Sequence, residues 1–298
     1  MRIANAPCSW GVLEFGLDGQ IDHYSKVLDE MTETGYNGTE LGDWGFMPTD
    51  PKELSQELQK RKLHLVGAFV PVNFIDENCH KGGAENAIRI ASLLKGADPE
   101  NARIVLSDDN GKNKTRTSNA GRIKPHHGLD DSDMTRFSKG VEYIAKEVLD
   151  QTGVISVFHH HCAGFIETPE EIEKLLNKTD DQLVSLCFDT GHFEFGGGNA
   201  LQGLRQFSDR IKHVHFKDFN QKVYETAFED EMNYFDSVRN GIFCELGNGS
   251  ISFDLIYQEL KNQKYDGWIV VEQDVLPGMG SPKASAHRNR EYLRSIGI

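Results

Sequence analysis

The chain of 298 residues lacks several features typical of membrane, secreted or nucleic-acid-binding proteins. It has no apolar run of about 18 residues, the length that a membrane-spanning helix requires. Residues 1–10 lack a long apolar core followed by a small-residue cleavage site, which argues against a secretory signal peptide. We therefore expect a cytoplasmic protein that is not attached to a membrane.

Cysteine and positive charge are also scarce. The five cysteines, at positions 8, 79, 162, 187 and 244, are odd in number and have no CxxC spacing. We predict reduced thiols, with neither a disulfide framework nor a thiolate metal site. Lys and Arg total 32 against 46 Asp and Glu, which gives a formal net charge of -14. Such a chain would repel nucleic-acid phosphates, so we expect no nucleic-acid partner. A hydrophobic fraction of 38% and a mean hydropathy of -0.50 predict a soluble globular protein.

The sequence is rich in short apolar runs that alternate with helical patterns. We predict strands at 2–6, 37–41, 64–72, 102–106, 154–158, 184–188, 211–216 and 268–271. Helices are predicted over 22–34, 51–62, 84–94, 130–149, from 168 onward, and over 199–207, 253–262 and 283–294. This alternation implies parallel strands with helical crossovers. A closed (β/α)8 TIM barrel is the economical arrangement, and a doubly wound open sheet is the alternative.

The connections argue for one domain over 1–298. No linker rich in Pro, Gly or Ser divides the chain, and no Gly-x-Gly-x-x-Gly follows the first strand, which disfavours dinucleotide binding. Two connections are long, 107–129 and 219–252, and the second contains a predicted helix around 227–238. Both follow strands, so we expect them on the C-terminal face as lids or binding loops.

Imidazoles and carboxylates recur at the ends of four predicted strands. Three histidines, 159–161, end one apolar run, and Asp189 and His192 follow the next. His215 belongs to the seventh strand, and Glu272 directly follows the eighth. The carboxyl ends of parallel strands meet at one face of a barrel, where such groups are costly unless they are paired or bound to a metal. The recurrence predicts a divalent-metal site.

Each residue also has a structural explanation on its own. His215 would be a hydrogen-bonded core histidine, Asp189 a turn former or helix cap, and Glu272 the partner of a lysine. The coincidence of four strands favours the metal site. Two carboxylates with two imidazoles suit Mn²⁺, Co²⁺, Zn²⁺ or Fe²⁺.

Five motifs carry a family resemblance. They are Asn5-Ala-Pro-Cys-Ser-Trp10-Gly, His159-His-His161, Asp189-Thr-Gly-His192, His213-Val-His215-Phe-Lys217-Asp218 and Gly267-Trp-Ile-Val-Val-Glu272-Gln-Asp. Together they resemble the xylose-isomerase-like barrel superfamily of sugar isomerases and epimerases, over nearly the whole chain. The single motifs are shared across that superfamily. The triple histidine followed by Glu-Thr-Pro-Glu-Glu, and the long segment after strand seven, resemble more narrowly the inosose dehydratase branch.

The resemblance implies a four-ligand metal site. The usual ligands of the superfamily are a glutamate after strand five, the aspartate of Asp-x-x-His, a histidine after strand seven and a glutamate after strand eight. The last three fall on Asp189, His215 and Glu272. His159 stands where the first glutamate is expected, and we keep it as the fourth ligand. Because that glutamate also moves protons in the isomerases, its replacement favours a lyase. We expect Mn²⁺ or Co²⁺, with Zn²⁺ or Fe²⁺ as alternatives.

The resemblance further implies elimination of water from a cyclic polyol ketone such as 2-keto-myo-inositol, in inositol catabolism. The base and acid are sought among His161, Lys217 and Glu40, whereas His192 and Trp10 are expected to contact the substrate. A metal-dependent sugar or sugar-phosphate isomerase or epimerase is the alternative, in which the cations of the first long loop would bind phosphate: Lys112, Lys114, Arg116, Arg122 and Lys124. A non-enzymatic sugar-binding barrel is a third possibility. The only expected partners are a small-molecule polyol or sugar and, by resemblance, further copies of the chain in a homo-oligomer.

Overall fold

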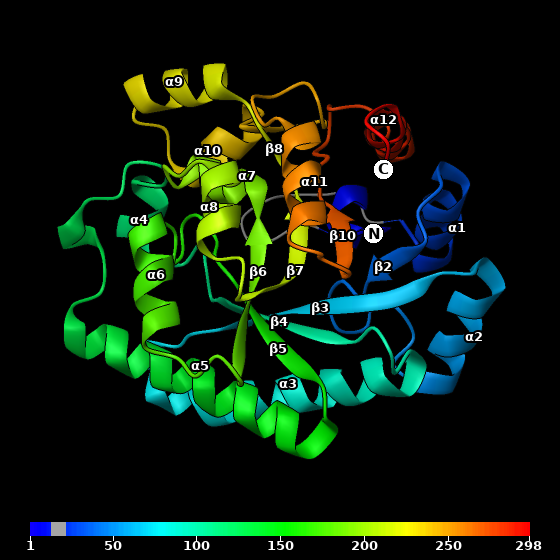
Figure 1. Cartoon of the computed structure of the whole chain (residues 1–298), viewed down its shortest axis with the longest axis horizontal. Coiled ribbons are helices and arrows are strands. Elements are labelled where there is room, and N and C mark those ends of the chain that lie inside the picture. The colour runs from blue at the N-terminus through cyan, green and yellow to red at the C-terminus, as the bar shows by residue number, and fades with distance from the viewer. Residues whose placement is uncertain (13–21) are drawn as a thin grey trace.

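The strands close into a barrel. A computed structural model describes residues 1–12 and 22–298. Parallel strands pair in the closed order β1-β10-β7-β6-β5-β4-β3-β2 (Figure 1). Their bounds are β1 Arg2–Asn5, β2 Gly38–Glu40, β3 His64–Val72, β4 Arg103–Asp108, β5 Ile155–His159, β6 Val184–Asp189, β7 Ile211–Phe216 and β10 Trp268–Val271. The predicted (β/α)8 barrel is confirmed, and the open sheet is excluded.

Helices connect the barrel strands and cover the barrel from outside. Their bounds are α1 Tyr24–Thr34, α2 Pro51–Arg61, α3 Glu77–Ala97, α4 Lys114–Ser118, α5 Asp131–Thr152, α6 Pro169–Asn177, α7 Thr190–Phe195, α8 Ala200–Gln206, α11 Phe253–Asn262 and α12 Pro282–Ser295. The longest two, α3 and α5, pack against each other beside β3, β4 and β5 (Figure 1). Within the described ranges, no helix is both long and apolar enough to cross a membrane.

Helix α3 begins seven residues earlier than the predicted start at 84. The side chain of Asp76 caps it by accepting a hydrogen bond from the amide of Asn78. Two glycines in this first part weakened the helical pattern of the sequence. The space around Gly83 explains one of them, because a Cβ there would lie 2.9 Å from both Ile144 and Val72. The glycine therefore lets α3 approach α5 and β3 closely.

Each strand is buried on both faces, as the apolar runs require. Ile104, Leu106 and Phe158 pack into the large core between strands and helices. Their neighbours Val105 and Val157 point inward and pack with Cys187 inside the barrel. The interior is thus filled by side chains and is not a pore. Polar groups enter it toward the carboxyl end of the strands.

The two long connections contact each other. Residues 219–252 form α9 (Gln221–Glu229) and α10 (Tyr234–Arg239), next to a small hairpin of β8 (Asp218–Phe219) and β9 (Phe243–Cys244). The prediction of one helix around 227–238 was wrong, because Asn233 caps a second helix within that range. Arg122 of the first connection donates to the carbonyls of Ala227 (3.3 Å) and Met232 (3.0 Å).

A buried ion pair fixes the first connection to α6. Arg116 is fully buried, and its two terminal nitrogens donate to the two carboxylate oxygens of Glu171 at 2.8 and 2.7 Å. Its Nε–H donates to the carbonyl of Gly164 at 2.6 Å. Bidentate pairs of this kind are specific and strong. The side chains of Arg116 and Arg122 therefore stabilise the fold, and their contacts within the protein argue against a role in binding phosphate.

We expect Arg116→Ala to lower the free energy of unfolding by about 3–5 kcal/mol, because it leaves the Glu171 carboxylate buried without its partner. Urea unfolding of the purified protein measures this. The exposed Lys114 of the same helix provides the control, and Lys114→Ala should change stability by less than about 0.5 kcal/mol. Equal effects of the two variants would contradict the anchoring role.

Candidate active site

Four strands carry the predicted side chains to the carboxyl end of the barrel. The register pairs His159 of β5 with Cys187 of β6, and Asp189 of β6 with His215 of β7. The amide of Glu272 donates to the carbonyl of Phe216 at 3.0 Å, which extends the pairing of β10 with β7 by one residue. Because side chains alternate along a strand, these residues reach the same interior.

The donor atoms of His159, Asp189, His215 and Glu272 lie within 4.8 Å of one another. Asp189 Oδ2 lies 3.7 Å from both His159 Nε2 and His215 Nδ1. Glu272 Oε1 lies 3.2 Å from His215 Nδ1. Ligands about 2.1 Å from a shared ion would lie roughly 3–4 Å apart. The spacing is therefore that of donors around a common point.

Helix α7 orients Asp189. Its Oδ1 caps the helix by accepting the amide of His192 at 2.7 Å, which leaves Oδ2 facing the two imidazoles. The helix cap that the sequence allowed for Asp189 is therefore present. Gly191 is required beside it because a Cβ there would lie 2.8 Å from Cγ of Lys217.

Glu40 reaches across from β2 and holds two imidazoles of β7. Its Oε1 lies 2.8 Å from His213 Nε2 and 3.0 Å from His215 Nε2. Burial acts to raise the pKa of Glu40, but these imidazoles outweigh it and lower the pKa to about 2. A carboxylate at Nε2 sets the tautomer of His215 and turns Nδ1 toward Asp189 and Glu272. Glu40 also lines the cavity above the donors.

Lys217 lies beside this group with two carboxylates. Its Nζ is 3.1 Å from Asp274 Oδ2 and 3.4 Å from Glu272 Oε2. Burial acts to lower the pKa of Lys217, yet Asp274 and Glu272 outweigh it and hold the pKa well above its usual value. Lys217 is therefore a cation. Asp274 was not predicted from the sequence. It lies two residues after Glu272, and in an extended segment this spacing places both side chains on the same side.

His161 also lines the cavity. Its Nδ1 lies 2.6 Å from the carbonyl oxygen of Cys162 and 2.5 Å from Nδ2 of Asn110. Burial first, and the Lys217 cation second, lower the pKa of His161 to about 4. At neutral pH the ring is uncharged.

A cavity of about 330 Å³ opens above the donors. It is bordered by β1, β2, β3 and the start of the first long connection, and its walls include His159, His161, Lys217 and Glu272. Five carboxylates and two lysines line it: Glu40, Asp43, Asp109, Glu272 and Asp274, with Lys112 and Lys217. Its size suits a small ring, and its charge favours a hydroxylated ligand over a phosphate ester.

The structure does not bring two predicted substrate contacts to the cavity. Trp10 is 1% exposed, and its indole Nε1–H donates to Glu30 Oε2 at 2.8 Å, so it packs in the barrel wall. His192 lies behind His161, with ring centroids 3.8 Å apart. The segment 219–252, all of which is described, contributes Tyr234 and Phe243 behind these rings and no residue of the cavity lining.

Comparisons with known proteins agree with this geometry. Residues 28–296 match the family described as xylose isomerase-like TIM barrel. A relative from Bacillus thuringiensis (strain Al Hakam), named inosose dehydratase, is 30% identical over 294 residues, 99% of this chain and 96% of that one. A relative of the same name from Lacticaseibacillus casei is 30% identical over 295 residues, 98% and 96% of the two chains.

Solved structures share the fold at low identity. The IOLI protein with a bound zinc atom has a TM-score of 0.72 at 16% identity, over 99% of this chain and 98% of that one. The probable 3-DHS dehydratase AsbF from Bacillus anthracis has a TM-score of 0.71 at 14% identity, over 99% of both chains.

The chain therefore belongs to the xylose isomerase-like TIM barrel family. Its full-length relatives are dehydratases, which makes it a sugar-processing enzyme of the dehydratase type, a carbon–oxygen lyase.

The two faces of β5 predict different outcomes for neighbouring histidines. His160 is fully buried, packs on Phe188 and Phe193, and its Nε2 accepts the amide of Asp189 at 3.2 Å. We expect His160→Ala to cost roughly 2–4 kcal/mol of unfolding free energy, since it leaves a closed cavity. His159→Ala, which opens onto the cavity where water can enter, should cost less. Denaturant unfolding of the metal-free variants measures both, and the reverse order would refute this placement of β5.

Proposed function

We propose that the chain eliminates water from a cyclic polyol ketone of the inosose type, such as 2-keto-myo-inositol, with a divalent ion held by His159, Asp189, His215 and Glu272. The observation that carries the proposal is the convergence of these four donors next to a ring-sized cavity that His159 and Glu272 line. The names of the full-length relatives supply the substrate class. We also infer that residues 1–298 act as one domain.

Unpartnered buried atoms support the ion. Asp189 Oδ2 and His215 Nδ1 are both buried and have no hydrogen-bond partner. Polar atoms are rarely buried without a partner, and these two face each other across 3.7 Å. Two nitrogen and two oxygen donors suit Mn²⁺ or Co²⁺, with Zn²⁺ or Fe²⁺ as alternatives. When bound, the ion would act as a Lewis acid toward the ketone oxygen of the substrate.

Protein residues would perform the proton transfers. Elimination needs a base for the proton α to the ketone and an acid for the departing hydroxyl. His161 is uncharged and lines the cavity, so we assign it as the base. Lys217 is protonated and forms ion pairs with Asp274 and Glu272, so we assign it as the acid. The proton that His161 takes is returned to solvent, the one that Lys217 gives leaves with the water, and Lys217 regains a proton from solvent.

Glu40 has a different place in this scheme. Because its carboxylate already accepts hydrogen bonds from His213 and His215, we propose that it mainly orients His215. The direct catalytic role predicted for Glu40 from the sequence remains a prediction.

The replacement of a glutamate by His159 favours elimination over isomerisation. A symmetric two-glutamate isomerase or epimerase mechanism uses two like groups to take and return protons on the substrate. Here the proposed base is a neutral imidazole and the proposed acid is a lysine cation, so the two differ in charge and in direction of transfer. The carboxylate-rich cavity also disfavours a sugar phosphate.

The ligand set predicts the effect of three substitutions. Asp189→Asn, His215→Ala and Glu272→Gln should each weaken Mn²⁺ or Co²⁺ binding by at least about 100-fold, since each removes a donor from a set of four. Competition with a chromophoric chelator measures the affinity, and circular dichroism checks the fold. The matched control is Asp109→Asn, a carboxylate of the cavity outside the set, which should stay within about threefold. Unchanged affinity in all three variants would rule out the site.

The reaction is tested with the metal-loaded enzyme and 2-keto-myo-inositol. We expect the substrate mass to fall by one water, with new ultraviolet absorbance from a conjugated enone or dione. A panel of ketoses and ketose phosphates serves as the comparison. Turnover of a ketose or its phosphate without a mass change, and none of the inosose, would assign the enzyme to the isomerases instead.

A further inference from the structure

A buried thiol lies one layer below the proposed metal ligands. Cys187 is fully buried, two residues before Asp189 on β6, so both side chains point into the barrel. The register places it beside His159 of β5 and His213 of β7. The sequence predicted no thiolate metal site, because no two cysteines have CxxC spacing. In the fold, the partners of the thiol come from neighbouring strands instead.

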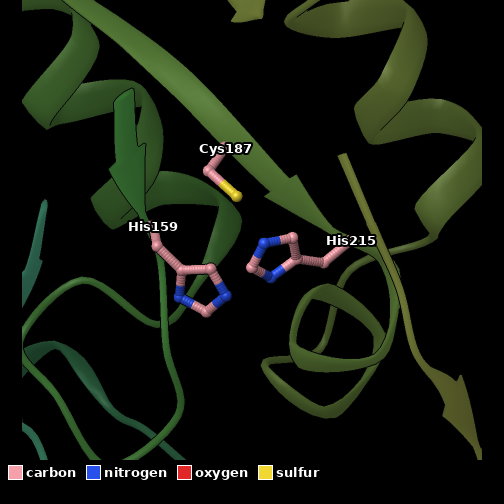
Figure 2. A group of neighbouring side chains, drawn as sticks. All are labelled: His159, Cys187 and His215. Carbon is pink, nitrogen blue, oxygen red and sulfur yellow. The ribbon is translucent and has the colours of Figure 1, made fainter. Parts of the chain in front are cut away.

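The thiol and two imidazoles form a second group of donors. Cys187 Sγ and one nitrogen each of His159 and His215 lie within 4.8 Å of one another. Figure 2 shows the three side chains pointing toward a common space from β5, β6 and β7. His159 Nδ1 and His215 Nδ1 are buried without a hydrogen-bond partner. Each imidazole therefore has a ring nitrogen that could bind a metal ion together with the thiol.

We propose that Cys187, His159 and His215 form an alternative binding site for a thiophilic ion such as Zn²⁺ or Cd²⁺, distinct from the carboxylate-containing set. Soft thiolate ligands select such ions, whereas Mn²⁺ prefers oxygen donors. Binding displaces the thiol proton to solvent, as it does at other cysteine sites. The fourth position belongs to water or to a carboxylate from the layer above.

The two donor sets exclude each other because they share His159 and His215. An ion in the thiol set withdraws both imidazoles from Asp189 and Glu272. A thiophilic ion would then inhibit an enzyme that uses Mn²⁺ or Co²⁺. This consequence for activity rests on the proposed function, but the existence of the thiol site does not.

The test is a Cd²⁺ titration of the metal-free full-length protein, followed by ultraviolet absorbance. We expect a sulfur-to-cadmium charge-transfer band that saturates at one equivalent. Cys187→Ser, which keeps nearly the same volume in a buried position, should abolish the band and weaken Cd²⁺ binding by at least about 30-fold. The Mn²⁺ affinity of the same variant should stay within about threefold.

Cys162→Ser is the matched control. Cys162 is equally buried, but its Sγ donates to the carbonyl of His192 and it belongs to no donor group found among the described residues. The band should persist in that variant. Cd²⁺ binding without a sulfur band, a band that survives Cys187→Ser, or no Cd²⁺ binding would each overturn the thiol site. Normal Mn²⁺ binding alongside any of these would leave the proposed function standing, so the two failures are distinguishable.

Discussion

The buried imidazole of His215 is the group around which the site is arranged. Its Nε2 is held by Glu40 and its Nδ1 faces Asp189 and Glu272, so one ring is bordered by three carboxylates in the interior of the barrel. Burying this much charge is costly unless the charges compensate one another. Cys187 first, and then Glu272 and Glu40, hold the pKa of His215 well above its usual value, against the effect of burial. The proposed divalent cation at Nδ1 would take the place of a proton on that nitrogen and would compensate the carboxylates instead.

The same constraint sets the charges of the proposed acid and the proposed base. Lys217 extends the charged row by pairing with Asp274 and Glu272, while His161 stays neutral because burial and the nearby Lys217 cation both disfavour its protonated form. Opposite protonation states thus arise within one cavity from the surroundings of each residue. The fold contributes by bringing one donor or proton carrier from each of several strands to the same end of the barrel.

The sequence predicted the barrel because its strands are apolar on both faces. The strand ends predicted a metal site, and the family resemblance then selected His159, Asp189, His215 and Glu272. It could not predict partners that depend on closure of the barrel. Glu40 and His215 are 175 positions apart, and Arg116 and Glu171 are 55 apart, with no local pattern joining them. Trp10 and His192 were expected at the substrate, yet their rings pack behind the wall. Side chains two residues apart in a strand point to the same side, so the spacing of Asp274 from Glu272 and of Cys187 from Asp189 would have predicted both near the site.

X-ray absorption spectroscopy at the manganese edge of the Mn²⁺-loaded protein tests the central claim most directly, namely that His159 and His215 share one ion with Asp189 and Glu272. Imidazole rings give a characteristic multiple-scattering pattern, so their number can be fitted. The account predicts a shell of nitrogen and oxygen donors that contains two imidazoles, falling to one in His159→Ala. A shell with one imidazole or none in the unsubstituted protein would contradict it.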